Sequence, residues 1–515
     1  MSFKLQPEEK KLNNIILSVL KKAAILVCLF LCSYNASSAS VTDRPVAIVT
    51  DDQWNFDSTT KKAYDLVLNL QVEQAHQLIP QPVTAQEHYV TALAEALELL
   101  ITEDGEKYTE YEDKFNQRLE RKTKTTLPDD LFLQAEIRLQ WAFVYLKFGH
   151  EFDAALNLRQ AYLTVQEVKK RFPSFQAIKK TSGLLEIIIG SVPQKYNWVL
   201  SLLSIEGSTK TGFEELESIR FSDSPFSLEA SLIHSLIEGF LLQQKSSATI
   251  EIKNLVSKYP SNRLVLFLGS ALKVKNGQSE EALIMLDSLS KLSQGLPLYY
   301  ADYLKGEIYL YREEYLNSIS SYRWFINHYN GQNYIKDAYY KIGLCYWLNG
   351  NTNDALSIFK QAKASGKEAS EADKYAARSL AEDELPHVNL TKARYATDGG
   401  YYEKASQILE SLQPGDIPTL RDQVEFHYRK ARVAHKSNDF VAAKRYYQQC
   451  IDLNGDEEWY YAPNACLQLG YIVLSEGDNI LARNYFNKAL LYNKHEYKNS
   501  IDSKAKSALA QIKRK

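Results

Sequence analysis

The sequence predicts an all-α protein in which helical hairpins stack into a superhelical α-solenoid. Three observations predict this fold. Small and aromatic residues recur at shared offsets, glycines stand where hairpins would turn, and neighbouring copies lie 37 to 39 residues apart. Such a period is typical of repeat proteins, in which each unit buries its apolar face against the next unit.

The clearest hairpin lies in residues 336–363 and is anchored on Gly343. Tyr339 and Tyr346, four residues before and three after the anchor, fall on the same helical face. Gly350 follows at the point where a left-handed residue would end the helix. A second helix then presents its own apolar face, which consists of Ala355, Phe359 and Ala362.

The same offsets return in five further stretches. The copy around Gly470 keeps them without a gap, and the copy around Ala431 has Asn438 at its turn. Three weaker copies are anchored at Gly306, at Gly269 (with a one-residue insertion) and at Ala142. The anchors from 269 to 470 are 37, 37, 88 and 39 residues apart, so the longest gap has room for one more degenerate unit.

A two-helix unit with these residues at these offsets resembles the tetratricopeptide repeat. The copies around Gly343 and Gly470 match that motif well, and the other copies are degenerate. The alternative is a helical bundle with accidental similarity. The joint recurrence of turn glycines and second-helix alanines disfavours it.

Three stretches resemble a particular group of tetratricopeptide-repeat proteins, the family that includes fungal inclusion-body clearance proteins of the mitochondrial outer membrane. They are residues 183–217, 428–432 and 460–471. The resemblance covers most of the mature chain and implies the same repeat architecture. An export signal departs from that family's cytosolic start, so we interpret the chain as an exported bacterial relative.

Residues 1–39 have the features of a Sec-type signal peptide. Lysines, among them Lys21 and Lys22, precede an apolar run at 23–32, and Ala39 ends a stretch of small residues suited to cleavage. The run is too short to span a bilayer alone, and an uncleaved anchor that also uses residues 15–20 is the less favoured alternative. We therefore expect a periplasmic or cell-surface protein, associated with the cell envelope.

The mature chain divides into three predicted parts: a flexible leader at 40–56, an N-terminal helical region with degenerate repeats at 57–260, and a C-terminal repeat array at 261–515. Asp57 or Ser58 is expected to cap the first helix, and the pair Ser261–Asn262 to cap a later one. Ile501–Ile512 is expected to form a helix that covers the open end of the array.

No motif points to catalysis, to a cofactor or to a metal ion. The net charge of −2 gives no bulk electrostatic attraction to nucleic acid. Phosphate-binding glycine loops, zinc-type histidine helices and nucleophile-elbow serines do not occur in the sequence. Cys345, Cys450 and Cys466 are expected to be buried in repeat helices, with a Cys450–Cys466 bond as an alternative.

Protein binding is the predicted activity. The first helix of each unit would line a concave surface, and aromatic residues there suit the capture of a protein or peptide. The alternative is that neighbouring helices cover these side chains. The candidate groove residues are Tyr303, Tyr311, Tyr340, Trp347, Tyr428, Arg432 and Tyr471.

Two function classes follow. The first is a non-enzymatic exported scaffold or adaptor that binds a protein partner of unknown identity. The second is a cell-surface carbohydrate-binding protein similar to the helical starch-binding outer-membrane proteins, which also expose aromatic side chains on repeat helices. An enzyme whose site is assembled by the fold is a third, weaker interpretation, and a cleft of perturbed carboxylates would favour it.

Overall fold

A computed structural model describes residues 54–120, 127–192, 200–201, 203–242, 245–382 and 384–512. In these residues 24 α-helices follow one another as sequential hairpins, which confirms the predicted all-α superhelix. The α-helices in chain order are α2 (Ser58–Leu68), α3 (Val72–Leu78), α4 (Ala85–Thr102), α5 (Gly105–Glu120), α6 (Pro128–Phe148), α7 (Glu151–Arg171), α8 (Ile178–Gly190), α10 (Thr209–Arg220), α11 (Ser227–Leu236), α12 (Lys245–Lys258), α13 (Arg263–Lys275), α14 (Ser279–Ser290), α15 (Tyr299–Tyr311), α16 (Tyr315–His328), α17 (Ile335–Leu348), α18 (Thr352–Ala364), α19 (Glu371–Ala381), α20 (Val388–Gly399), α21 (Tyr402–Glu410), α22 (Leu420–Lys436), α23 (Phe440–Asn454), α24 (Tyr461–Ser475), α25 (Asn479–Leu491) and α26 (Lys498–Ile512).

The anchor glycines allow the two helices of a hairpin to approach closely. A Cβ added to Gly343 in α17 would lie 2.5 Å from the ring of Phe359 in α18, and Gly470 in α24 meets Phe486 in α25 at the same distance. Gly350 has a φ of +85°, the left-handed conformation predicted for that turn. The hairpin contact expected from the sequence is therefore confirmed.

Side chains at the helix starts explain where several helices begin. The Asp57 carboxylate accepts hydrogen bonds from the backbone N–H groups of Thr59 and Thr60, so Asp57 is the N-cap of α2. Asn262 caps α13 in the same way. Pro128 occupies the first turn of α6, where its missing N–H costs no hydrogen bond.

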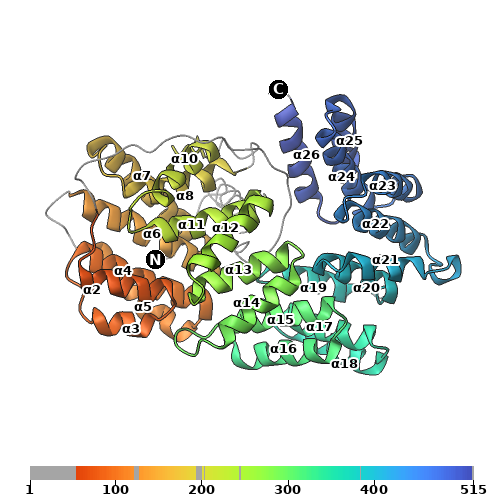
Figure 1. Cartoon of the computed structure of the whole chain (residues 1–515), viewed down its shortest axis with the longest axis horizontal. Helices are drawn as coiled ribbons and strands as arrows, with labels where there is room; N and C mark the ends of the chain where they lie inside the picture. The colour runs from red at the N-terminus through yellow and green to blue at the C-terminus, as the bar shows by residue number, and fades with distance from the viewer. Residues whose placement is uncertain are drawn as a thin grey trace, which may run out of the picture.

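Helices α2 to α17 curve round until the chain meets its own beginning (Figure 1). Asn69 accepts a hydrogen bond from the backbone N–H of Arg263 at 2.8 Å, and the Leu70 carbonyl accepts one from Leu296 at 2.8 Å. Further along, Glu103 contacts Asn333, 230 residues away in the sequence. We call this closed arrangement of α2 to α17 the ring.

Helices α20 to α26 form an arm beside the ring, at the right of Figure 1. One hydrophobic core extends from Trp54 to Tyr395 and a second from Val424 to Ile512, with a small cluster between them. The predicted boundary at residue 260 falls inside the first core. Helix α26 packs on α25 and α24, as expected for a terminal capping helix.

The signal peptide, most of the leader and the segment from Pro193 to Trp198 lie outside the described residues. Among the helices that are described, none combines the length and the apolar character needed to cross a membrane.

Candidate functional site

The ring surrounds a partly open cavity of about 230 Å³, which we call the chamber. Its wall is built mainly by α4, α6, α8, α11 and α13, which all face the middle of the ring. Leucine, isoleucine and phenylalanine side chains provide most of this wall, among them Leu93, Leu97, Phe143, Leu184, Leu232 and Leu268. A concave and mostly apolar space with a few polar groups has the character of a ligand site.

Helix α6 contributes polar side chains to the chamber at helical spacing. Glu136, Gln140, Phe143 and Lys147 all line it, and their spacing places them on one face of the helix. Gln140 is 8% exposed, and neither its amide nitrogen nor its amide oxygen has a hydrogen-bond partner. Buried polar groups are nearly always hydrogen-bonded, so Gln140 is the exception in this wall.

Glu103 closes the ring at the edge of the chamber. Its carboxylate accepts hydrogen bonds from the Tyr329 hydroxyl, the Gln332 backbone N–H and the Asn333 side-chain amide, the last at 2.8 Å. It also forms an ion pair with Lys147 at 3.3 Å. Burial alone would raise the pKa of Glu103, but Lys147 and the hydrogen bonds outweigh it and hold this pKa below its ordinary value.

Lys180 of α8 lies buried between two carboxylates at another part of the wall. Its ammonium group is 2.8 Å from Glu136 and 2.7 Å from Glu229. The Tyr64 and Tyr89 hydroxyls donate to the second oxygen of Glu229. Burial disfavours the charged form of Lys180, but the two carboxylates outweigh it and raise its pKa. The pKa of Glu136 is also raised, by its burial and by the nearby charge of Glu229, against the effect of Lys180.

Four of the seven predicted groove residues are buried, so in this structure they do not line an open groove. Tyr303 donates to Asp337, and Tyr311 donates to Glu307 at 2.8 Å and stacks on Tyr395 of α20. Because α17 and α20 pack against α15, the rings of Tyr303 and Tyr311 belong to the core. This outcome matches the alternative that neighbouring helices cover them.

Tyr340 and Tyr428 are covered in the same way. Tyr340 packs against Phe359 and Tyr375, with ring centroids 5.7 and 6.3 Å away. Tyr428 is 3% exposed and packs beside Tyr461. The three remaining candidates, Trp347, Arg432 and Tyr471, are half-buried.

We expect Tyr340→Ala to lower the free energy of unfolding by about 3 kcal/mol, because truncating a buried aromatic ring leaves a cavity. Chemical denaturation followed by circular dichroism measures this loss. The matched control is Leu356→Ala on the paired helix α18, where the side chain is 51% exposed and little change is expected. An equally small effect of both variants would mean that Tyr340 is not part of the core.

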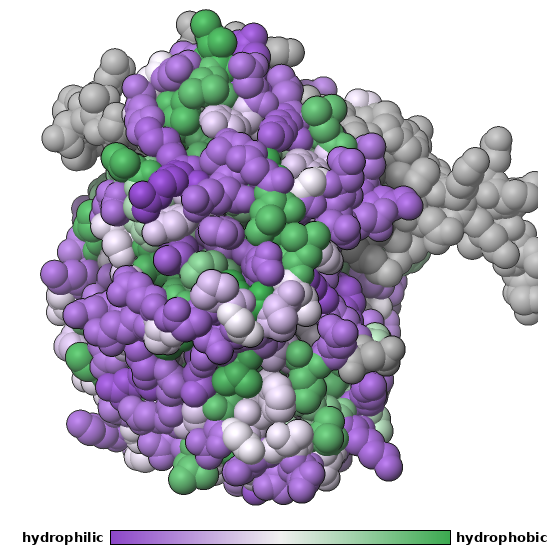
Figure 2. Space-filling view, turned by 90° about the vertical axis from the view of Figure 1, so that its right-hand side faces the viewer, coloured by the Kyte–Doolittle hydropathy of each residue, from purple (hydrophilic) through white to green (hydrophobic). Residues whose placement is uncertain are grey.

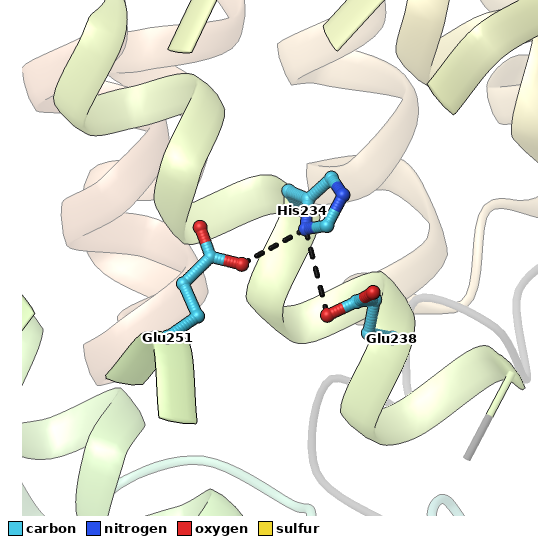
Figure 3. A group of neighbouring side chains, drawn as sticks. All are labelled: His234, Glu238 and Glu251. Atoms are coloured by element: carbon cyan, nitrogen blue, oxygen red, sulfur yellow. Dashed lines mark hydrogen bonds and ion pairs between the residues drawn. The ribbon is translucent and has the colours of Figure 1, made fainter. Parts of the chain in front are cut away.

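His234, Glu238 and Glu251 form a group that could hold a metal ion (Figure 3). His234 Nδ1 lies 2.9 Å from Glu251 and 3.6 Å from Glu238, which belongs to the short π-helix η2 (Ile237–Leu242). Arg220 donates a hydrogen bond to Glu251, and its guanidinium nitrogen lies 3.1 to 3.2 Å from both ring nitrogens. Arg220 therefore supplies the positive charge beside these carboxylates, and a metal ion would have to displace it.

The three cysteines expected in repeat helices are buried free thiols. Cys450 and Cys466 are not bonded, so the alternative of a disulfide does not hold. Burial raises the pKa of Cys466 to about 12, which keeps it as the unreactive thiol at neutral pH.

Comparison with known proteins identifies two of the hairpins. The tetratricopeptide-repeat model matches residues 336–364, which form most of α17 and α18, and residues 424–457, which include most of α22 and α23. None of the curated proteins that were compared matches the sequence.

Matches to solved structures have low sequence identity and low TM-scores, as two of them show. A human IFIT1 dimer with PPP-AAAA is 14% identical, with 89% of this chain and 95% of that chain covered and a TM-score of 0.31. The P58(IPK) TPR domain is 15% identical, with 79% and 97% covered and a TM-score of 0.21. The family match and the hairpin geometry together lead to one conclusion: this is an all-α protein that contains tetratricopeptide repeats, at α17–α18 and at α22–α23.

Proposed function

We propose that the chain is an exported, non-enzymatic scaffold that binds a protein partner through its C-terminal arm. The observation that carries this proposal is the match of α22–α23, within the arm, to the tetratricopeptide repeat; a second match, α17–α18, precedes the arm. Arrays of such repeats generally present a concave surface to protein partners. Export rests on the predicted signal peptide at residues 1–39.

The partner surface that we propose lies on the first helices of the arm. Arg432 of α22 and Tyr471 of α24 each follow a repeat anchor by one residue, and both are half-buried. Tyr471 packs beside Phe486 at 5.2 Å, which holds its ring in place. Tyrosine and arginine are enriched among residues that dominate protein interfaces. Trp347 is a weaker candidate, because its indole N–H already donates to the Pro386 carbonyl at 2.9 Å.

The outer helices of the arm are less suited to a large apolar interface. Val441 and Ile480 are 80% and 78% exposed on α23 and α25. On the face seen in Figure 2, apolar residues lie in separate patches among hydrophilic ones. Scattered exposed apolar side chains of this kind are normal for a protein surface.

The experiment is an affinity capture from envelope extract with the mature chain, residues 40–515, read by mass spectrometry. We expect a protein partner that is retained by the wild type and lost, at least tenfold, with the Arg432→Ala/Tyr471→Ala double variant. The matched control is Val441→Ala/Ile480→Ala, on the paired helices of the same hairpins. Loss with the control alone would reject the proposed surface, and binding on a parallel glycan array without any protein partner would favour the carbohydrate-binding alternative.

A further inference from the structure

The chamber has features of a ligand site that the scaffold proposal leaves unused. Its lining is predominantly apolar, and its volume is about 230 Å³. A cavity of about 150 Å³ lined by leucine, isoleucine and phenylalanine holds a benzene molecule. At the same ratio of cavity volume to ligand atoms, the chamber has room for a molecule of roughly nine non-hydrogen atoms.

The charged groups of the chamber are already satisfied by one another. Both oxygens of Glu136 accept hydrogen bonds, from Lys180 and Thr181, and both oxygens of Glu229 accept them from Lys180 and from tyrosine hydroxyls. Lys147 is paired with Glu103. An anionic ligand would find no spare cation among these groups, and a cationic one no spare carboxylate, so an occupant should be uncharged.

Gln140 offers the one unsatisfied polar group on the α6 face that lines the chamber. Its side-chain nitrogen is a donor, its oxygen is an acceptor, and neither has a partner. A buried amide left without partners destabilises the folded state. An amide group on a ligand complements it atom for atom, since it also carries an acceptor and a donor side by side.

The volume of the chamber favours a small molecule over an extended peptide. A space of about 230 Å³ holds a body of roughly nine non-hydrogen atoms, which is fewer than an extended peptide contains.

We propose that the chamber binds a small, uncharged, largely apolar molecule that carries one amide group, with Gln140 as the hydrogen-bond partner of that amide. This site is separate from the partner surface on the C-terminal arm. Gln140 then has a physical reason to remain polar in an apolar wall.

The test uses the full chain and hexanamide as the probe, with hexanoate as a charged probe of the same length, in isothermal titration calorimetry. We expect hexanamide to bind the wild type at least tenfold more tightly than hexanoate. Gln140→Leu should reduce hexanamide affinity at least tenfold. The melting temperature of the same variant should equal that of the wild type or exceed it by up to roughly 2 °C, because the variant lacks the unsatisfied amide.

A second variant keeps the test decisive if Gln140→Leu fails to fold. Leu97→Phe enlarges a half-buried wall residue and leaves Gln140 in place, and it should also reduce hexanamide affinity at least tenfold. Equal hexanamide binding by the wild type and both variants would overturn the proposal. So would the absence of hexanamide binding, or tighter binding of a capped leucine-rich hexapeptide.

Discussion

Glu103→Ala is expected to destabilise the protein by about 4 kcal/mol, because it removes one partner of a buried ion pair and orphans several donors at once. Glu103 is 7% exposed, and its carboxylate pairs with Tyr329, Gln332, Asn333 and Lys147. Without it, the Lys147 ammonium and the Asn333 amide lose their partners. The contact between α4 and the loop before α17 should then open, so the radius of gyration measured by small-angle X-ray scattering should also increase.

The exposed neighbour Glu106 provides the control. Glu106→Ala should leave both stability and size nearly unchanged, and Glu103→Gln should lie between the two, since it keeps the shape but loses the charge. Because the folded-state pKa of Glu103 is lowered, its contribution is present above the unfolded value near 4.5 and is lost as pH falls through the folded pKa. Urea titrations at pH 7 and pH 4 measure this. Equal stability of the Glu103→Ala and Glu106→Ala variants would show that this carboxylate does not close the ring.

The hairpins could be predicted from the sequence because their determinants are local. Gly343 and Phe359 lie 16 residues apart and touch within one unit, so their spacing alone predicts the contact. Turn residues act over an even shorter range, and Gly350 and Asn438 adopt positive φ as their positions predict. Two adjacent helices therefore carry most of the information about their own packing.

The closure of the ring could not be predicted in this way. Glu103 and Asn333 are 230 residues apart, and whether they meet depends on small rotations accumulated over many hairpins. The burial of Tyr303 and Tyr340 has partly the same origin, because α17, which contacts Tyr303, and α19, which carries Tyr375 against Tyr340, lie outside their own hairpins. A sequence offset shows which face of a helix a ring occupies, but not what packs over that face.

The chamber did leave a signal in the sequence. Glu136 and Gln140 stand four residues apart in α6, each between two apolar neighbours, and Lys180 stands just before the mostly apolar segment 183–189. Polar residues at helical spacing within apolar helices indicate either a buried network or a site. Which of these applies depends on partners from other helices, such as Glu229, that only the fold brings near.

Lys180→Met tests whether that buried network needs its cation. The substitution keeps an unbranched side chain but leaves Glu136 and Glu229 facing each other without the ammonium that lies 2.8 and 2.7 Å from them. Removing one partner from a buried charge pair costs about 3 to 5 kcal/mol. Denaturant unfolding should show a loss of this size, whereas the half-buried neighbour Lys179, changed to methionine, should change stability by less than about 1 kcal/mol.

The pH dependence of the Lys180→Met variant separates this electrostatic cause from a simple packing defect. Without the ammonium, burial and repulsion from Glu229 should raise the folded-state pKa of the Glu136 carboxyl group further above its unfolded value. Groups with a raised folded pKa stabilise the protein at low pH and lose that contribution as pH rises. The gap between variant and wild type should therefore be larger at pH 8 than at pH 5, and adding Glu136→Gln should reduce it at pH 8. A gap that stays constant between these pH values would mean that the loss comes from packing, and that Glu136 does not depend on Lys180 for its charge.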